Sequence, residues 1–182
     1  NALASRHEDG TAPQAFSSFN LFQTPECIVD IMTEKAGSLV NKRILEPSAG
    51  LGRIYKGILK AGGEDITLIE NDKDICGELY KMTEGTESSL LQGDFLSKKD
   101  LGLFDIILMN PPFKMGEDLK HILHAKSMLK DGGLLVSLCY DGLKQNKQLK
   151  PIADSWEVLP AGSFKESGTS AGVALLTIRT GI

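Results

Sequence analysis

Residues 43–53 read RILEPSAGLGR, a short apolar run that ends in an acidic residue and leads into a turn with two glycines. Gly50 and Gly52 let the backbone pass close to a ligand, and a helix that starts at this turn would present free N–H groups to it. A dinucleotide-binding turn would carry a third glycine where this chain has Tyr55. The stretch therefore favours a strand–turn–helix unit at a ligand site, and a tight turn without a ligand is the second interpretation.

Outward from this turn, apolar runs alternate with amphipathic stretches, as in a parallel sheet covered by helices. The predicted fold class is α/β: a Rossmann-like, mostly parallel sheet of seven strands with helices on both faces. The last two strands have no room for a helix between them, which predicts an antiparallel hairpin. Strands are expected at 43–46, 66–70, 89–93, 104–109, 134–140, 157–159 and 173–179, and helices at about 24–37, 52–61, 73–82, 117–129 (with a stop at Asp131-Gly132-Gly133) and 142–153.

The composition indicates one globular domain, since the chain has 182 residues of which 41% are hydrophobic and 24% charged. Residues 1–18 lack periodicity and are predicted to form a flexible segment ahead of a single domain at 19–182. No apolar stretch is long enough to span a bilayer, so we expect a cytoplasmic protein without a membrane partner.

Charge and metal-ligand patterns exclude several classes of site. The net charge of −4 gives a poor overall field for holding a polyanion. His121 and His124 lie three residues apart without an evident third ligand, so both are expected on the surface and no metal site is predicted.

Acidic residues end the next two predicted strands. Glu70 follows Glu46 by 24 residues, where an acidic side chain in such folds reaches a ribose diol. Asp94 precedes Phe95, so a carboxylate and an aromatic ring stand together at the third strand end. Each residue alone is also a normal helix cap or loop residue. Together with the glycine turn they predict an adenosine-binding site.

The tetrapeptide Asn110-Pro111-Pro112-Phe113 follows a strongly apolar strand, at the edge where ligands bind in open α/β sheets. The two prolines fix φ and remove two N–H donors, so the backbone presents carbonyls. The Asn110 side-chain oxygen and the Pro111 carbonyl are thereby suited to accept hydrogen bonds from one NH₂ group, and Phe113 offers a surface for stacking an extruded base. A rigid turn without chemistry is the alternative.

These motifs resemble the S-adenosylmethionine-dependent amino-methyltransferases, specifically the adenine-N6 DNA methyltransferases, from about Phe22 to Arg179. The resemblance implies the class I methyltransferase fold, S-adenosylmethionine as cofactor and a Phe22–Pro25 segment at the methionine end. Asn71 stands where the family often has an apolar residue. The implied cofactor-binding residues are Thr24, Glu46, Pro47, Ser48, Ala49, Gly50, Gly52, Glu70, Asn71, Asp94, Phe95 and Asn110.

The same resemblance implies catalysis by Asn110, Pro111, Pro112 and Phe113. Phe164 resembles the family's aromatic contact to the flipped base, although an ordinary buried phenylalanine fits as well. The implied substrate-binding residues are Phe113, Lys114, Phe164 and Lys165. The implied partner is a nucleic acid, with DNA favoured, and a partner subunit could supply target recognition. Lys144, Lys147 and Lys150 at helical spacing form either a solvated face or a phosphate-steering stripe.

Three other functions stay open. An RNA guanine-N2 methyltransferase uses an NPPF tetrapeptide on a different amine, and protein glutamine methylation uses a similar NPPY. The Phe22–Pro25 segment favours adenine in DNA over both. The third is a cofactor-binding subunit of a larger complex that does not itself catalyse the transfer.

Overall fold

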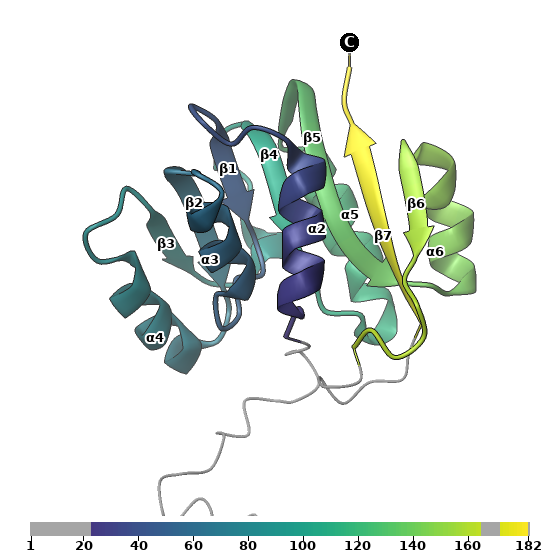
Figure 1. Ribbon diagram of the computed structural model, residues 1–182, viewed down its shortest axis with the longest axis horizontal. Helices are drawn as coiled ribbons and strands as arrows, with labels where there is room; N and C mark the ends of the chain where they lie inside the picture. The colour runs from purple at the N-terminus through teal and green to yellow at the C-terminus, as the bar shows by residue number, and fades with distance from the viewer. Residues whose placement is uncertain (1–22, 165–171, 182) are drawn as a thin grey trace, which may run out of the picture.

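The structure, a computed structural model, describes residues 23–164 and 172–181 (Figure 1). The predicted flexible segment at 1–18 lies outside these residues. A sheet of seven strands forms the centre, in the order β3-β2-β1-β4-β5-β7-β6. Its strands are β1 (Arg43–Glu46), β2 (Asp65–Glu70), β3 (Ser89–Gln92), β4 (Phe104–Met109), β5 (Leu129–Tyr140), β6 (Ser155–Val158) and β7 (Val173–Arg179). The helices are α2 (Glu26–Ala36), α3 (Arg53–Lys60), α4 (Lys73–Thr83), α5 (Glu117–Lys126) and α6 (Leu143–Gln148), with short turns η1 (Phe95–Ser97), η2 (Lys114–Gly116) and η3 (Lys150–Ile152).

The pairing of the strands confirms the predicted Rossmann-like class. The strands β3, β2, β1, β4 and β5 are parallel, whereas β7 lies antiparallel between β5 and β6. The strand order reverses between β1 and β4, so crossovers leave these two strands in opposite directions. In open α/β sheets such a switch point opens a crevice at the carboxyl ends of the strands.

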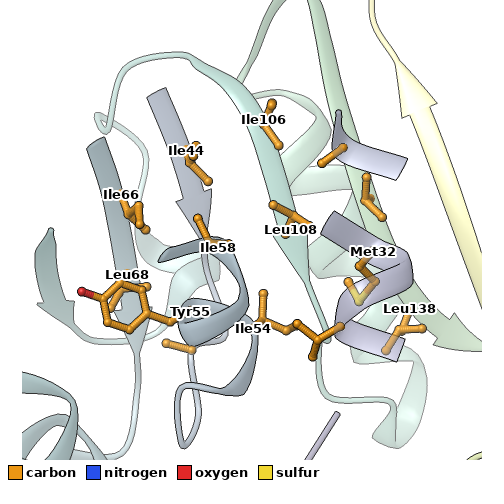
Figure 2. Packing of buried hydrophobic residues seen from close by; sticks show 14 of the residues in the cluster. Met32, Ile44, Ile54, Tyr55, Ile58, Ile66, Leu68, Ile106, Leu108 and Leu138 are labelled. Carbon is orange, nitrogen blue, oxygen red and sulfur yellow. The ribbon is translucent and has the colours of Figure 1, made fainter. Parts of the chain in front are cut away.

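Two hydrophobic clusters cover the two faces of the sheet, because successive side chains of a strand point to opposite faces. On one face Ile44 and Ile106 pack with residues of α2, α3 and α4, as Figure 2 shows for the first two helices. On the other face Leu45 and Ile107 pack with α5 and η1. Helices on both faces, as predicted, hold the strand ends in fixed positions around the crevice.

Gly52 is required where the glycine turn meets α3. Its φ of +86° lies in the left-handed region, which costs other residues about 1–2 kcal/mol. A Cβ atom at this position would lie 2.6 Å from Cε of Met82 and 3.3 Å from Cδ2 of Leu79. Gly52 therefore lets α4 pack closely behind the turn.

The predicted helix at 117–129 is too long, because α5 ends at Lys126 and β5 already begins at Leu129. Leu129 pairs with Phe104 of β4, and the register of this ladder then shifts before Ile106 pairs with Leu134. Gly132 has a φ of +77° within this irregular part of the strand. The glycine pair that was predicted to stop a helix thus bends a strand.

The predicted helix at 142–153 is also interrupted, since α6 ends at Gln148 and η3 follows. Pro151 lacks the N–H that an α-helix would need at this point, so the chain continues as a tighter turn. Within the described part of the chain, no helix has the length and apolar character needed to cross a membrane.

Candidate functional site

A cavity of about 610 Å³ lies at the carboxyl ends of β1, β2, β3 and β4. Its walls come from the glycine turn at 47–51, the segments 70–72 and 93–95, and the segment after β4. Because these strands are parallel, their ends meet at one edge of the sheet and bring distant motifs together. The volume is within the range of pockets that hold cofactors and small ligands.

Glu70 braces the glycine turn against the end of β2. Its Oε1 accepts a hydrogen bond from the Gly50 backbone N–H at 2.9 Å, and its Oε2 accepts one from the Asp72 N–H at 2.7 Å. Burial raises the pKa of Glu70, although these N–H donors offset part of the rise. The carboxylate is thus oriented at the cavity wall, where it can accept hydrogen bonds from a ligand hydroxyl.

Glu46 is fully buried at the end of β1, directly behind the lining residues Pro47 and Ser48. Neither of its carboxyl oxygens has a partner in good hydrogen-bond geometry among the described residues, although the Ser48 backbone N–H lies close enough to act on the carboxyl. Burial, and secondly the nearby charge of Glu70, raise the pKa of Glu46 well above its ordinary value, and the Ser48 backbone N–H offsets only part of this rise. A cationic group in the cavity would lower this pKa again, so the site fits a ligand that carries positive charge.

Asn110 is held by two segments at the end of β4. Its Nδ2 donates to Oγ1 of Thr24 at 3.0 Å, and its backbone carbonyl accepts a hydrogen bond from the Ser48 hydroxyl at 3.1 Å. Thr24 is 4% exposed, and its own carbonyl accepts a hydrogen bond from Arg53 at 3.2 Å. The segment before α2, the glycine turn and the tetrapeptide therefore form one connected unit, in which the amide of Asn110 has a defined orientation.

Asp94 and Phe95 lie at the third strand end, as predicted. Asp94 is exposed at the cavity wall and its Oδ1 caps η1 by accepting from the Leu96 N–H at 3.1 Å. The Phe95 ring is only 2% exposed and packs against the rings of His121 and His124, with centroids 5.7 Å and 4.7 Å away. Phe95 thus belongs to the core as well as to the cavity wall.

Most predicted site residues gather around this cavity. Those that line it are Thr24, Pro47, Ser48, Ala49, Gly50, Glu70, Asn71, Asp94, Phe95, Asn110, Pro112 and Lys114. Glu46, Gly52, Pro111 and Phe113 lie directly next to lining residues in the chain without lining the cavity themselves. Phe164 is 2% exposed within a hydrophobic cluster and is not a lining residue, so its role as a second wall stays a prediction. Lys165 lies outside the described residues.

His121 and Met115 are among the lining residues that the predicted site residues did not include. His121 was predicted to lie on the surface, which is wrong, because it is 7% exposed and lines the cavity. Its spacing from the buried Asp118 and Ala125 places it on the inner face of α5, a helical period that could have revealed it. Met115 also lines the cavity, is 86% exposed and has a φ of +55°. In the described ranges, no group of three or more potential metal ligands occurs, and His121 and His124 are not part of one.

Comparisons with known proteins identify the family of this chain. The family model for the methyltransferase small domain matches residues 10–164. A ribosomal RNA small subunit methyltransferase of Arabidopsis thaliana is 36% identical over 106 residues, which cover 55% of this chain and 30% of that protein. The type II methyltransferase M.CvrRI of Paramecium bursaria Chlorella virus XZ-6E is 27% identical over an alignment 188 positions long, which covers 90% of this chain and 49% of that protein. The chain therefore spans less than half the length of these two relatives.

Solved structures show the same fold. A Pyrococcus horikoshii protein that has been proposed to be an RNA methyltransferase superposes with a TM-score of 0.74 at 17% identity, covering 93% of this chain and 92% of that one. The 16S rRNA N2 G1207 methyltransferase RsmC of Thermus thermophilus superposes with a TM-score of 0.67 at 20% identity, covering 91% of this chain and 45% of that one. The Rossmann-like class I methyltransferase fold is thus established. With a family match over most of its length, the chain belongs to the methyltransferase small domain family, whose cofactor is S-adenosylmethionine.

Proposed function

We propose that this domain transfers a methyl group from S-adenosylmethionine to the exocyclic N6 amino group of adenine in DNA. The observation that carries the proposal is the orientation of Asn110, whose Nδ2 is bound to Thr24 Oγ1 at 3.0 Å beside the cofactor cavity. Since the NH₂ end of the amide is directed to Thr24, its Oδ1 is the end suited to a substrate amine. An acceptor at this place selects an NH₂ group over a carbonyl.

The residues of the chain would act by position rather than by proton transfer. The Asn110 oxygen and the Pro111 carbonyl would accept the two N–H bonds of one amino group and turn its lone pair toward the cavity. When bound, S-adenosylmethionine supplies a sulfonium methyl group with a neutral thioether as leaving group. The substrate nitrogen would form the new bond to this methyl group with its lone pair and would then lose one proton to solvent.

The cofactor would be held at three points of the cavity. The negative charge of Glu46, behind the cavity wall, would attract the positively charged methionine end. Glu70 would accept hydrogen bonds from the ribose hydroxyls, and Asp94 would lie at the adenine end. Thr24 links the methionine end to Asn110, which gives the segment before α2 a direct part in the site. This link supports the resemblance to adenine-N6 DNA methyltransferases, which rests on the same segment.

A ribosomal RNA substrate is the second candidate. It is supported by the 36% identity to the Arabidopsis thaliana ribosomal RNA small subunit methyltransferase. The type II relative matches across 90% of this chain against 55% for the ribosomal RNA relative, and we therefore place DNA first. Parallel assays of methyl transfer from labelled cofactor to plasmid DNA, ribosomal RNA and protein test the choice. Labelled N6-methyladenine in DNA is the expected product, and label found solely in RNA or protein would contradict the proposal.

A partner subunit or a further protein region would supply part of the recognition of the target sequence. The net charge is −4, so this domain alone offers little overall attraction for phosphates. Both curated relatives are much longer than the matched region. We therefore propose that a partner subunit or a further region contributes the contacts to base edges.

A local basic stripe is expected to strengthen the hold on DNA. Lys144 and Lys147 are exposed on α6, and Lys150 is exposed in η3. Replacing all three by glutamate is expected to weaken DNA binding about tenfold or more at low salt and to flatten the salt dependence of the binding constant, because phosphate contacts release counterions. Fluorescence anisotropy with a labelled duplex over a salt series measures both effects.

A matched control changes the net charge equally at a distance from α6. Lys56 and Lys60 on α3 and Lys81 on α4 are exposed, and their replacement by glutamate should leave the salt slope close to that of the wild type. If the two triple variants bind DNA equally well, the stripe is an ordinary solvated surface.

A further inference from the structure

Arg53 places a guanidinium at the edge of the cavity. It is the first residue of α3, directly after Gly52, and it is an exposed lining residue of the cavity. Its Nη1 donates to the backbone carbonyl of Thr24 at 3.2 Å, and Thr24 lines the cavity as well. The side chain therefore reaches from α3 to the segment before α2, where a bound ligand can contact it. The predicted site residues did not include Arg53.

A chain of hydrogen bonds connects Arg53 to the tetrapeptide and to the glycine turn. Oγ1 of Thr24 accepts from Asn110 Nδ2 at 3.0 Å, and the Asn110 carbonyl accepts from the Ser48 hydroxyl at 3.1 Å. Ser48 lies two residues after the buried Glu46. The same end of the cavity thus has a cationic group at its surface and a carboxyl group behind its wall. Such a pair suits a ligand end that carries both a negative and a positive charge.

The charged groups that line the rest of the cavity are mostly acidic. The lining carboxylates are those of Glu70, Asp72, Asp94 and Glu117. Besides Arg53, the lysine that lines the cavity is Lys114, which directly follows the tetrapeptide. A ligand carboxylate in this cavity is repelled by the acidic side chains unless a cation lies next to it. Arginine suits this task, because its planar guanidinium can donate two parallel N–H bonds to one carboxylate.

We propose that the guanidinium of Arg53 binds the α-carboxylate at the methionine end of S-adenosylmethionine. One N–H bond holds the Thr24 carbonyl, and the remaining donors form a fork of fixed geometry for the two carboxylate oxygens. Arg53 forms no ion pair with another described residue, so the ligand would supply its counter-charge. Arg53 is therefore a specificity residue for the amino-acid end of the cofactor. This inference rests on the cofactor of the proposed function and not on the methyl acceptor.

Calorimetry with S-adenosylmethionine and with its decarboxylated form tests this role. The two compounds share the sulfonium, the amino group and the adenosine, and they differ only in the carboxylate. The wild type should bind S-adenosylmethionine at least about tenfold more tightly, as expected for hydrogen bonds between charged groups. Arg53→Gln should bind S-adenosylmethionine about tenfold more weakly. It should bind the decarboxylated cation as tightly as the wild type or more tightly, because a repelling positive charge is gone.

Two further variants complete the test. Arg53→Lys keeps the charge without the fork of donors, so its preference should be intermediate. Lys56→Gln is the matched control, because it removes one positive charge from an exposed position of the same helix that does not line the cavity, and it should keep the preference of the wild type. The inference is overturned, with the cofactor left in place, by an Arg53→Gln variant that keeps the preference or binds both compounds more weakly by the same factor. A wild type without the preference overturns it too, and a wild type that binds neither compound overturns the cofactor assignment as well.

Discussion

Replacing Asn110 by alanine should lower the rate of methyl transfer by a factor of about 100 or more, the usual loss when one positioned polar group is removed from a reacting centre. The affinity for S-adenosylmethionine should change little, because the Glu46–Gly52 turn, Glu70 and Asp94 remain. Single-turnover kinetics with the best acceptor from the parallel assays, together with calorimetric titration of the cofactor, measures the two quantities separately.

Two further variants sharpen this result. Asn110→Asp keeps an oxygen for the amine but loses the Nδ2 donor to Thr24, so it should retain more activity than the alanine variant. Asn146 lies on α6 away from the cavity, and its side-chain amide donates to Asp141 and to the Gly142 carbonyl just before this helix, so Asn146→Ala should leave transfer unchanged. Wild-type rates in Asn110→Ala would show that the tetrapeptide is only a rigid turn.

The strand ends were predictable because strong local signals mark them. The bounds of β1, β4 and β7 agree with the expected ranges, because each strand is an apolar run that ends at a turn residue or at the prolines of the tetrapeptide. Parallel strands end at one edge, so Glu70, Asp94 and Asn110 had to come together once the alternation of strands and helices was recognised. The helix at 117–129 was misjudged because Gly132 and Gly133 signal equally well a helix stop and a bend in a strand.

The burial of polar side chains on α5 and their hydrogen bonds to distant residues gave no comparable signal in the local sequence. Asp118 stands in the first turn of α5, where an acidic residue normally faces solvent and stabilises the helix dipole. In the structure it is fully buried and accepts hydrogen bonds from the Tyr140 N–H at 2.8 Å and from Gln145 Nε2 at 3.0 Å. It thereby ties α5 to the end of β5 and to α6. The burial of His121 also results from the packing of α5 on the sheet, but here the helical spacing to Ala125 did offer a local signal.

Replacing Glu46 by glutamine should change stability and cofactor binding in opposite directions. The folded protein holds the pKa of Glu46 well above its ordinary value, so the unfolded chain releases this proton more readily. The free energy of unfolding contributed by this group is therefore fully present below the ordinary pKa and is lost as the pH rises through the folded pKa. At about pH 8 the variant without ligand should be more stable than the wild type, because the unfolded wild type releases a proton that the folded wild type holds, whereas the glutamine amide is neutral at every pH; the gain should grow by about 1.4 kcal/mol for each pH unit between the ordinary and the folded pKa. Denaturant unfolding at several pH values measures the gain, which should shrink at acidic pH.

The same variant should bind S-adenosylmethionine about tenfold more weakly, because it lacks the negative charge behind Pro47 and Ser48 that faces the cationic ligand. Binding to the wild type should release a fraction of a proton, since the ligand's positive charge lowers the pKa of Glu46, and Glu46→Gln should abolish this release. Calorimetry in two buffers of different ionisation enthalpy measures this proton release.

Glu64→Gln, at an exposed carboxylate away from the cavity, is the control and should match the wild type in stability, cofactor affinity and proton release. The opposite outcome is a Glu46→Gln variant that is less stable than the wild type at every pH, or one that binds the cofactor as tightly as the wild type does. Either result would show that Glu46 serves packing alone. The negative charge that the cavity offers to a sulfonium ligand would then have to come from Glu70.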